Sequence, residues 1–167
     1  VQTVDLSFQV GGPLAKLPVL EGQVINEGDL IASLEPKEFD LAVREARAQL
    51  KLASQDLKRK QQVFAEKGIA KSAVEDAETI FELRKVQLEK ALEALNDSTL
   101  KAPFSAYVGL RYIDNFTNVR PLEPVVRLYD LSEVLIVASV PEQILATAQP
   151  EHIIEITAEF PFLQEPV

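Results

Sequence analysis

The chain has 167 residues, of which 47% are apolar and 26% charged, and its mean hydropathy is +0.03. These values exclude a disordered tail, and no apolar run approaches the roughly 18 residues that a membrane span requires. The net charge of −9 argues against nucleic acid as a partner, and the lack of cysteine excludes disulfides, thiol nucleophiles and thiolate metal sites. Because the chain begins Val-Gln-Thr and contains no Met, we expect a processed product or a cut piece.

Two β-rich flanks enclose a charge-rich middle block without proline. Residues 37–101 hold 13 basic and 12 acidic residues and one glycine, Gly68. All ten prolines lie at Pro36 or earlier, or at Pro103 or later. This contrast predicts a helical insertion in a β domain, and therefore an α+β fold.

The first half of the middle block has the pattern of a helix with a coiled-coil seam. Apolar side chains recur at alternating steps of four and three residues after Pro36. Asp40–Arg44 and Asp56–Lys60 are expected to pair one turn apart on the solvated face. The seam residues are Phe39, Val43, Ala46, Leu50, Ala53, Leu57, Lys60 and Phe64.

The second half of the block predicts another helix, antiparallel to the first. Gly68 offers a left-handed C-cap for the first helix, and Ser72 to Glu75 fit a capping box for the second, whose seam Arg84 interrupts. Folding about Gly68 gives a rod on the order of 40 Å long, in which paired positions sum to about 138. The pattern alone does not choose between a docking arm and a solvated structural hairpin. The expected contacts are Phe64–Val74, Leu57–Phe81, Leu50–Leu88 and Val43–Leu95.

The flanks are two copies of one motif. A shift of 94 residues, without gaps, aligns nine positions. Each copy is too small to bury a core alone, so we expect the two copies to face each other in a β-sandwich from which the hairpin leaves. Since Gly22 and Gly28 become Phe116 and Leu122, we expect the turns of the second copy to differ. The aligned residues are Val10, Gly12, Leu14, Val19, Gly22, Ile25, Gly28, Ile31 and Leu34 with Phe104, Ala106, Val108, Ile113, Phe116, Val119, Leu122, Val125 and Leu128.

Three segments resemble one protein family. The run EGQVINEGDLIASL from Glu21, followed after the insert by KAPFSAYV from Lys101, resembles the split lipoyl/biotinyl-like domain of periplasmic adaptor proteins. These are the membrane fusion proteins of tripartite efflux pumps, in the HlyD-like superfamily. The segment Leu128 to Glu142 is similar to the family's passage into a β-barrel, and its Val-Pro-Glu looks most like adaptors of resistance-nodulation-division (RND) pumps.

The resemblance implies a domain division. It places the first lipoyl-like half at 6–36, the α-helical hairpin at 37–99 and the second half at 100–131. Residues 132–167 would be part of a β-barrel domain, with 1–5 as a possible return strand of that barrel. The expected architecture is therefore an elongated α+β fold: a lipoyl-like sandwich split by an antiparallel coiled-coil hairpin, plus part of a barrel.

The resemblance also implies a docking site at the hairpin tip. In the family, an Arg, an apolar residue four later and a Ser seven beyond that dock an outer-membrane channel; here these positions are Arg59, Val63 and Ala70. The Ser is therefore absent. On the residues alone we favour Arg59 as an ordinary solvated charge in Lys58-Arg59-Lys60, and the resemblance reverses that preference. Lys67, Gly68 and Ile69 complete the candidate docking residues.

The function that the resemblance implies is that of a periplasmic adaptor. It would link an inner-membrane transporter, which the resemblance gives as one of RND type, to an outer-membrane channel for export of drugs or other small molecules. Self-association as a trimer or hexamer would bring several hairpins together. The protein would lie in the periplasm of a Gram-negative bacterium, attached to the inner membrane in its full length.

Other functions have less support in the sequence. A lipoyl or biotinyl carrier would present a modified lysine on the turn that the hairpin occupies, whereas Lys37 and Lys101 lie at its edges. A cytosolic coiled-coil scaffold is a weaker third option. The single histidine, His152, lies in a strand-like stretch, and no catalytic or metal-binding motif is present. We therefore expect no enzyme and no cofactor.

Overall fold

The computed structural model describes residues 3–115 and 117–130. The expected barrel segment, 132–167, and His152 lie outside the described residues. Residues 3–5, considered above as a return strand of the barrel, belong to β1. The elements are β1 (Thr3–Ser7), β2 (Gly12–Lys16), β3 (Val24–Ile25), β4 (Leu30–Leu34), α1 (Lys37–Ala65), α2 (Lys71–Asp97), β5 (Thr99–Lys101), β6 (Ala106–Arg111), β7 (Asn118–Val119) and β8 (Pro124–Asp130).

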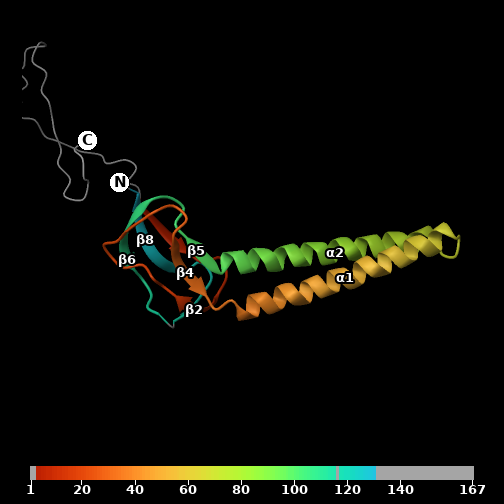
Figure 1. The fold of residues 1–167 in the computed structure, drawn as a ribbon, viewed down its shortest axis with the longest axis horizontal. Coiled ribbons are helices and arrows are strands. Elements are labelled where there is room, and N and C mark those ends of the chain that lie inside the picture. The colour runs from red at the N-terminus through yellow and green to blue at the C-terminus, as the bar shows by residue number, and fades with distance from the viewer. Residues whose placement is uncertain (1–2, 116, 131–167) are drawn as a thin grey trace, which may run out of the picture. The chain divides into compact units, whose positions relative to one another are not determined.

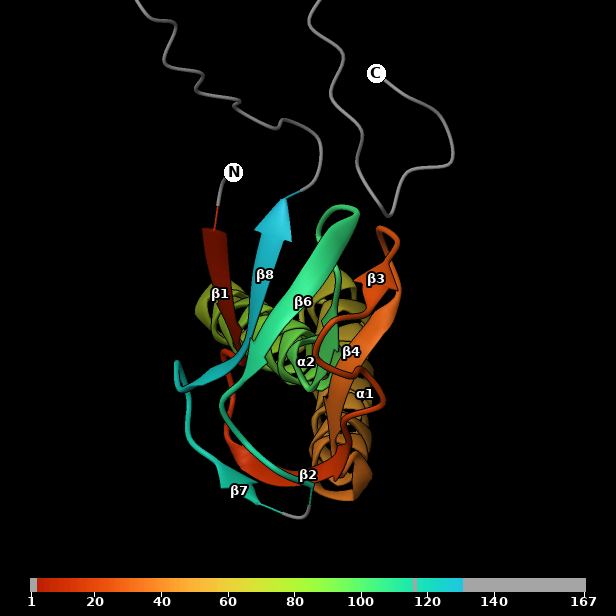
Figure 2. The ribbon, with the colours of Figure 1, turned by 90° about the vertical axis from the view of Figure 1, so that its left-hand side faces the viewer.

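The strands form two four-stranded antiparallel sheets, ordered β1-β8-β6-β3 and β5-β4-β2-β7 (Figure 2). A shift of 94 residues carries β2, β3 and β4 onto the first residues of β6, β7 and β8, and β1 onto a range that includes β5. The same shift converts the strand order of one sheet into that of the other. The repeat seen in the sequence is therefore a pseudo-twofold symmetry of the fold.

The two copies exchange strands. We expected each copy to face the other across the sandwich, but each sheet takes two strands from each copy. β1 pairs with β8 and β3 with β6, while β5 pairs with β4 and β7 with β2. A half this small leaves its backbone hydrogen-bonding groups and apolar face uncovered, and strand exchange satisfies both. Neither half is expected to fold without the other.

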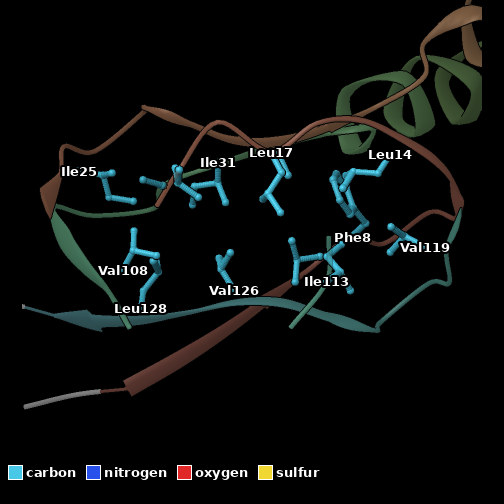
Figure 3. Packing of buried hydrophobic residues seen from close by; sticks show 14 of the residues in the cluster. Phe8, Leu14, Leu17, Ile25, Ile31, Val108, Ile113, Val119, Val126 and Leu128 are labelled. Carbon is cyan, nitrogen blue, oxygen red and sulfur yellow. The ribbon is translucent and has the colours of Figure 1, made fainter. Parts of the chain in front are cut away.

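The core lies between the two sheets, where their inward side chains meet (Figure 3). Equivalent positions of the repeat are buried alike: Ile31 and Val125 are both 0% exposed, and Leu34 and Leu128 are 1% and 0% exposed. Strict alternation would point residues three apart to opposite faces, but each strand has one extra residue in its ladder, Ile31 in β4 and Val125 in β8, which brings both members of each pair to the inner face. The spacing of three that marks the repeat therefore follows the shared core.

The turn before the last strand of each copy has the same geometry. In the first copy Gly28 has a φ of +85°, and in the second Leu122 has a φ of +63°. The Asn26 N–H donates to Asp29 Oδ2 at 2.8 Å, and the Arg120 N–H donates to Glu123 Oε2 at 3.0 Å. Our expectation that the turns differ is wrong at this turn. The second copy keeps the left-handed residue although it has no glycine there, which costs conformational free energy.

These turns give opposite predictions for two substitutions. Leu122→Gly is expected to raise the free energy of unfolding by about 1 kcal/mol, because Leu122 is 66% exposed and contributes strain without much packing. Gly28→Ala is expected to lower it by about 1 kcal/mol, since a Cβ there meets no atom within 4 Å and only the backbone is strained. Urea unfolding of both variants measures the effect. A loss of stability in Leu122→Gly would contradict the assigned strain.

An ion pair joins the outer strand β1 to its neighbour β8. Asp5 and Arg127 are opposite each other in the ladder, with Arg127 Nε and Nη2 donating to the carboxylate at 2.7 and 2.9 Å. The Tyr112 hydroxyl lies 3.3 Å from Asp5 Oδ1, and the Arg127 guanidinium lies over the Tyr112 ring at 5.7 Å. The hydrogen bond from Arg127 holds the pKa of Asp5 below its ordinary value.

This lowered pKa predicts a pH dependence. The stabilisation from Asp5 is present above the ordinary aspartate pKa of about 4 and is lost as the pH falls through the lower pKa of the folded state. Asp5→Asn is therefore expected to be less stable than the unsubstituted chain at pH 7, with the difference shrinking towards pH 2. Thermal unfolding of both chains across this range measures it. A constant difference at all pH values would show that the ion pair does not carry the effect.

The hairpin leaves one end of the sandwich, directly after β4, and returns to it at β5 (Figure 1). Most seam residues are buried or half-buried, as expected: Val43, Ala46, Ala53, Val74 and Ala77 are all below 9% exposed. On α1 the exception is Phe64, which is 41% exposed, and its expected contact with Val74 stays a prediction.

A polar bridge connects the helices where Arg84 interrupts the seam. Arg84 Nη1 lies 2.9 Å from Gln49 Oε1 and also 2.9 Å from Gln87 Oε1, and Gln49 Nε2 donates to Glu45 at 3.0 Å. Near the base, Val43 and Leu95 line one hollow, which fits their expected pairing. The bridge therefore joins the two helices through their side chains at the level where Arg84 interrupts the seam.

Candidate docking site at the hairpin tip

The loop between the helices ends α1 in a Schellman arrangement. The Gly68 N–H donates to the Val63 carbonyl at 2.9 Å and the Lys67 N–H donates to the Phe64 carbonyl at 2.8 Å. Lys67, with a φ of +57°, is the left-handed residue, so our assignment of that role to Gly68 is wrong. Gly68 is needed for a different reason: a Cβ there would lie 2.8 Å from Val63 Cγ1. The Val63 side chain therefore lies beside the loop.

The second helix begins two residues earlier than expected. Its N-cap is Ala70, with φ −71° and ψ 151°, and no side chain caps the helix. Ser72 is already inside the helix, so the expected capping box is wrong. Instead, Lys71 and Glu75 form an exposed ion pair at 2.8 Å. Ala70 therefore occupies a position where a hydroxyl would bond a free backbone N–H.

This cap position predicts a stabilising substitution. Ala70→Ser is expected to raise the free energy of unfolding of the hairpin by about 1 kcal/mol, because a serine there can accept a hydrogen bond from the first turn. Ser72→Ala is the control, and its effect should stay within about 0.5 kcal/mol. Thermal unfolding followed by helical circular dichroism measures both. The cap assignment fails if Ser72→Ala destabilises the hairpin by as much as Ala70→Ser was expected to stabilise it.

Arg59 is held by its neighbours on α1. Its Nη2 lies 3.1 Å from Asp56 Oδ1, and Lys60 Nζ lies 3.1 Å from Asp56 Oδ2. Hydrogen bonds from Lys60 and then Arg59 hold the pKa of Asp56 below its ordinary value, so the carboxylate stays charged. The Arg59 side chain is 70% exposed and has further N–H groups to offer to a partner carboxylate. The second expected ion pair does not form: among the described residues, no ion pair joins Asp40 to Arg44.

A hollow in the hairpin continues from Arg59 towards the middle of the rod. Its lining combines exposed apolar side chains with small residues of the seam and with charged groups. Leu52 on α1 is 65% exposed and Ile80 on α2 is 46% exposed. Val63, also on α1, is 41% exposed. The lining residues are Gln49, Leu52, Ala53, Asp56, Arg59, Ala77, Ile80 and Arg84.

The structure brings together part of the predicted set and adds to it. Val63, Lys67 and Gly68 meet in the Schellman loop, Ile69 is half-buried beside them, and Ala70 starts α2. The sequence reasoning missed Asp56 as the residue that holds Arg59. It also missed Leu52, although Leu41, Leu52 and Val63 recur every 11 residues, about three helical turns, which is a detectable signal.

The two lysines relevant to a carrier role lie at element boundaries. Lys37 is the first residue of α1 and Lys101 is the last residue of β5. Both are exposed, and Lys101 is opposite Leu30 in the sheet. Neither lies at the apex of a turn. Within the described residues, no cluster of His, Asp or Glu could hold a metal ion.

Comparison with known proteins identifies the family. Residues 2–124 match the family model described as the barrel-sandwich hybrid domain of RND MFP, the RND membrane fusion proteins. The chain belongs to this family. The lipoyl-like sandwich and the hairpin described above are thus the barrel-sandwich hybrid of an RND membrane fusion protein, as the resemblance predicted.

Named relatives of this RND membrane fusion protein support the same conclusion. It is 28% identical over 162 residues to the multidrug resistance protein MdtA of Proteus mirabilis, covering 87% of this chain and 39% of that protein. To MdtA of Pectobacterium carotovorum it is 29% identical over 161 residues, covering 87% and 39%. The chain therefore spans about two fifths of the length of the curated relatives it matches.

Solved structures show the same fold. A MacA–MexA chimera with the α-hairpin domain of Pseudomonas aeruginosa MexA gives a TM-score of 0.70 at 25% identity, covering 79% of this chain and 49% of that one. A candidate efflux transporter from Bacteroides eggerthii gives 0.76 at 28% identity, covering 79% and 40%. In the described part of this membrane fusion protein, neither helix has an apolar stretch of the length and purity that crossing a bilayer demands.

Proposed function

We propose that the chain is the central part of a periplasmic adaptor that links an inner-membrane RND transporter to an outer-membrane channel, for export of drugs or other small molecules. Family membership and the MdtA relatives support a role in multidrug efflux. The observation that carries the linking role is the hairpin, which extends from a well-packed sandwich and exposes its tip (Figure 1).

The tip has the chemistry of a docking surface. Arg59 offers guanidinium N–H groups for a carboxylate or for carbonyl groups at the end of a partner helix. Val63 lies beside the loop at Gly68 and offers an apolar side chain to a groove between partner helices. Lys67, Gly68, Ile69 and Ala70 shape the end of the rod between these groups. In this role the protein assembles with its partners and transmits force between them, and it catalyses no reaction.

The alternative role as a lipoyl or biotinyl carrier has no comparable support. A carrier needs a lysine at the apex of the turn between the two halves, where it can reach an enzyme. The hairpin occupies that turn, and Lys37 and Lys101 lie at its base. We therefore retain the adaptor function, with the protein in the periplasm of a Gram-negative cell and attached to the inner membrane in its full length.

Co-purification from cells tests the proposal. The tagged full-length protein, isolated after mild cross-linking, is expected to retain an RND transporter and an outer-membrane channel, and its deletion is expected to raise drug susceptibility. Arg59→Ala should lower the recovered channel and leave the transporter unchanged, whereas the matched control Arg47→Ala should change neither. Unchanged drug susceptibility on deletion, or equal channel recovery from all three proteins, would contradict the adaptor role.

A further inference from the structure

The seam of the hairpin contains a charged group that no carboxylate neutralises. Arg84 interrupts the apolar seam of α2, and among the described residues it takes part in no ion pair. Its hydrogen bonds to Gln49 Oε1 and Gln87 Oε1, each of 2.9 Å, both start from Nη1. Both acceptors are neutral amide oxygens, so the positive charge of Arg84 stays uncompensated at this level of the rod.

The other edge of the Arg84 guanidinium has the geometry of a carboxylate site. Nη1 has two N–H groups, one for each glutamine, and the structure gives Nε and Nη2 no acceptor among the described residues. These two nitrogens form the fork that binds a carboxylate through two parallel hydrogen bonds. Because the glutamines already hold the guanidinium in place, a ligand loses less free energy in ordering it.

An apolar hollow begins at this guanidinium. The hollow that Arg84 lines has a volume of about 340 Å³, within the range of about 300–1,000 Å³ that is typical of small-molecule sites. Its apolar lining combines the buried seam residues Ala53 and Ala77 with the exposed side chains of Leu52 and Ile80. The small alanines leave apolar surface in water that the hydrocarbon part of a ligand can cover.

The charges at the two ends of the hollow are unequal. At the end nearer the tip, Arg59 already has a carboxylate partner, Asp56, whose negative charge repels a second anion. Gln49, which bonds Arg84, is ten residues from Arg59 on α1, or about 15 Å, which an extended chain of about twelve carbons spans. An anionic head at Arg84 therefore leaves its tail running towards the tip along the apolar lining.

The sign of the local charge selects the ligand. A second hollow, formed by α2 alone, is lined by Glu75, Glu78 and Glu82, which repel a carboxylate. The whole chain carries a net charge of −9, so an anion gains no long-range attraction and must be bound by local contacts. A cationic or uncharged amphiphile in the first hollow would leave the charge of Arg84 uncompensated.

We propose that this hollow binds one free fatty acid of about twelve carbons, with its carboxylate on Nε and Nη2 of Arg84 and its tail between Leu52 and Ile80. The carboxylate supplies the negative charge that the seam lacks, and the tail covers the apolar surface that the alanines leave open. The adaptor thus has a small-molecule site on the shaft of the hairpin, in addition to the protein contacts proposed at its tip. Binding at this site does not depend on docking by the tip.

Calorimetric titration of the 167-residue chain with dodecanoate, below the concentration at which it forms micelles, tests the site. One equivalent is expected to bind, and decanoate should bind about tenfold more weakly, because it lacks two of the buried methylene groups. Dodecyltrimethylammonium, which has the same tail and the opposite charge, should show no saturable binding. Binding of this cation as tight as that of dodecanoate would contradict the role of Arg84.

Substitutions assign the affinity to the two parts of the hollow. Arg84→Gln is expected to weaken dodecanoate binding by about tenfold or more, since the amide cannot neutralise the carboxylate. Leu52→Ser should weaken it by about fivefold, and the exposure of Leu52 makes this change compatible with the folded hairpin. Arg47→Gln and Leu41→Ser are the matched controls. Both residues are exposed on α1 and neither lines this hollow, so dodecanoate should bind both variants with unchanged affinity.

Helical circular dichroism checks that each variant is folded, and Leu52→Ser keeps the test decisive if Arg84→Gln disturbs the seam. Absence of saturable dodecanoate binding, or an equal loss in Arg84→Gln and Arg47→Gln, overturns the inference. Sedimentation detects another occupant: if a second copy fills the hollow, Leu52→Ser separates the copies and dodecanoate does not bind, which also overturns it. Dodecanoate binding by a full-length protein that recovers no channel would instead overturn the proposed function alone.

Discussion

Leu128→Ala is expected to lower the free energy of unfolding by about 2–5 kcal/mol, which is a large part of the stability of a domain this size. Leu128 is 0% exposed and lies in the core between the two sheets (Figure 3). The lost transfer free energy and the cavity left behind both contribute, since neighbouring strands on either side limit relaxation. Denaturant unfolding, followed by a signal from the sandwich, measures the change.

The pseudo-twofold symmetry makes this prediction sharper. Leu34 is the equivalent residue of the first copy and is 1% exposed, so Leu34→Ala should destabilise the sandwich by a similar amount. Leu110→Ala is the control: Leu110 is 45% exposed on β6, and its truncation should cost less than about 1 kcal/mol. If Leu34→Ala left the strands of the second copy intact, the two copies would be independent units, contrary to the exchanged strands described above.

Val63→Asp is expected to reduce binding of the full-length protein to its outer-membrane channel by about thirtyfold or more. Val63 is exposed at the tip, so the substitution is compatible with the folded hairpin, but it places an unpaired charge in the proposed contact. Gln61→Asp, at another exposed position of α1, adds the same charge and should leave binding unchanged. Binding to the purified channel and drug susceptibility of cells are the two measurements.

The result for Val63→Asp separates docking from folding. Circular dichroism of the variant should show unchanged helix content, since the helix ends through backbone bonds that do not use the valine side chain. An equal loss of binding in Gln61→Asp would mean that added negative charge, not the lost apolar knob, weakens the contact.

Much of the fold follows from local patterns that the sequence displays. The alternation of steps of four and three along α1 and α2 reflects burial in one seam, and the 94-residue repeat reflects one shared core. Strand exchange between the copies could not be read in this way, because an internal repeat leaves the pairing of its strands open. The exposure of Phe64 was not predictable either, because the seam pattern shows which residues share a face and not how far a partner covers each of them.

The turn at the tip was predicted less well, because residue types only bias which residue takes the left-handed conformation and where the next helix begins. Glycine is the usual left-handed residue after a helix, yet here Lys67 takes that conformation and Gly68 permits close approach to Val63. Ser72 and Glu75 had the spacing of a capping box, but α2 begins before them and Glu75 pairs with Lys71. Leu122 is a further case: leucine disfavours the left-handed conformation, but the tertiary structure imposes it here, so the residue type does not predict it.

Cysteine cross-linking in cells tests the account most directly. Single cysteines replacing Val63 or Ala70 at the tip of the full-length protein should form cross-links to an outer-membrane channel, while a cysteine replacing the exposed Ala48 on the shaft should not. Cross-linked products are identified by mass spectrometry in cells whose drug efflux requires the protein. If efflux persists and neither tip position cross-links to a channel, the docking role of the hairpin tip is contradicted.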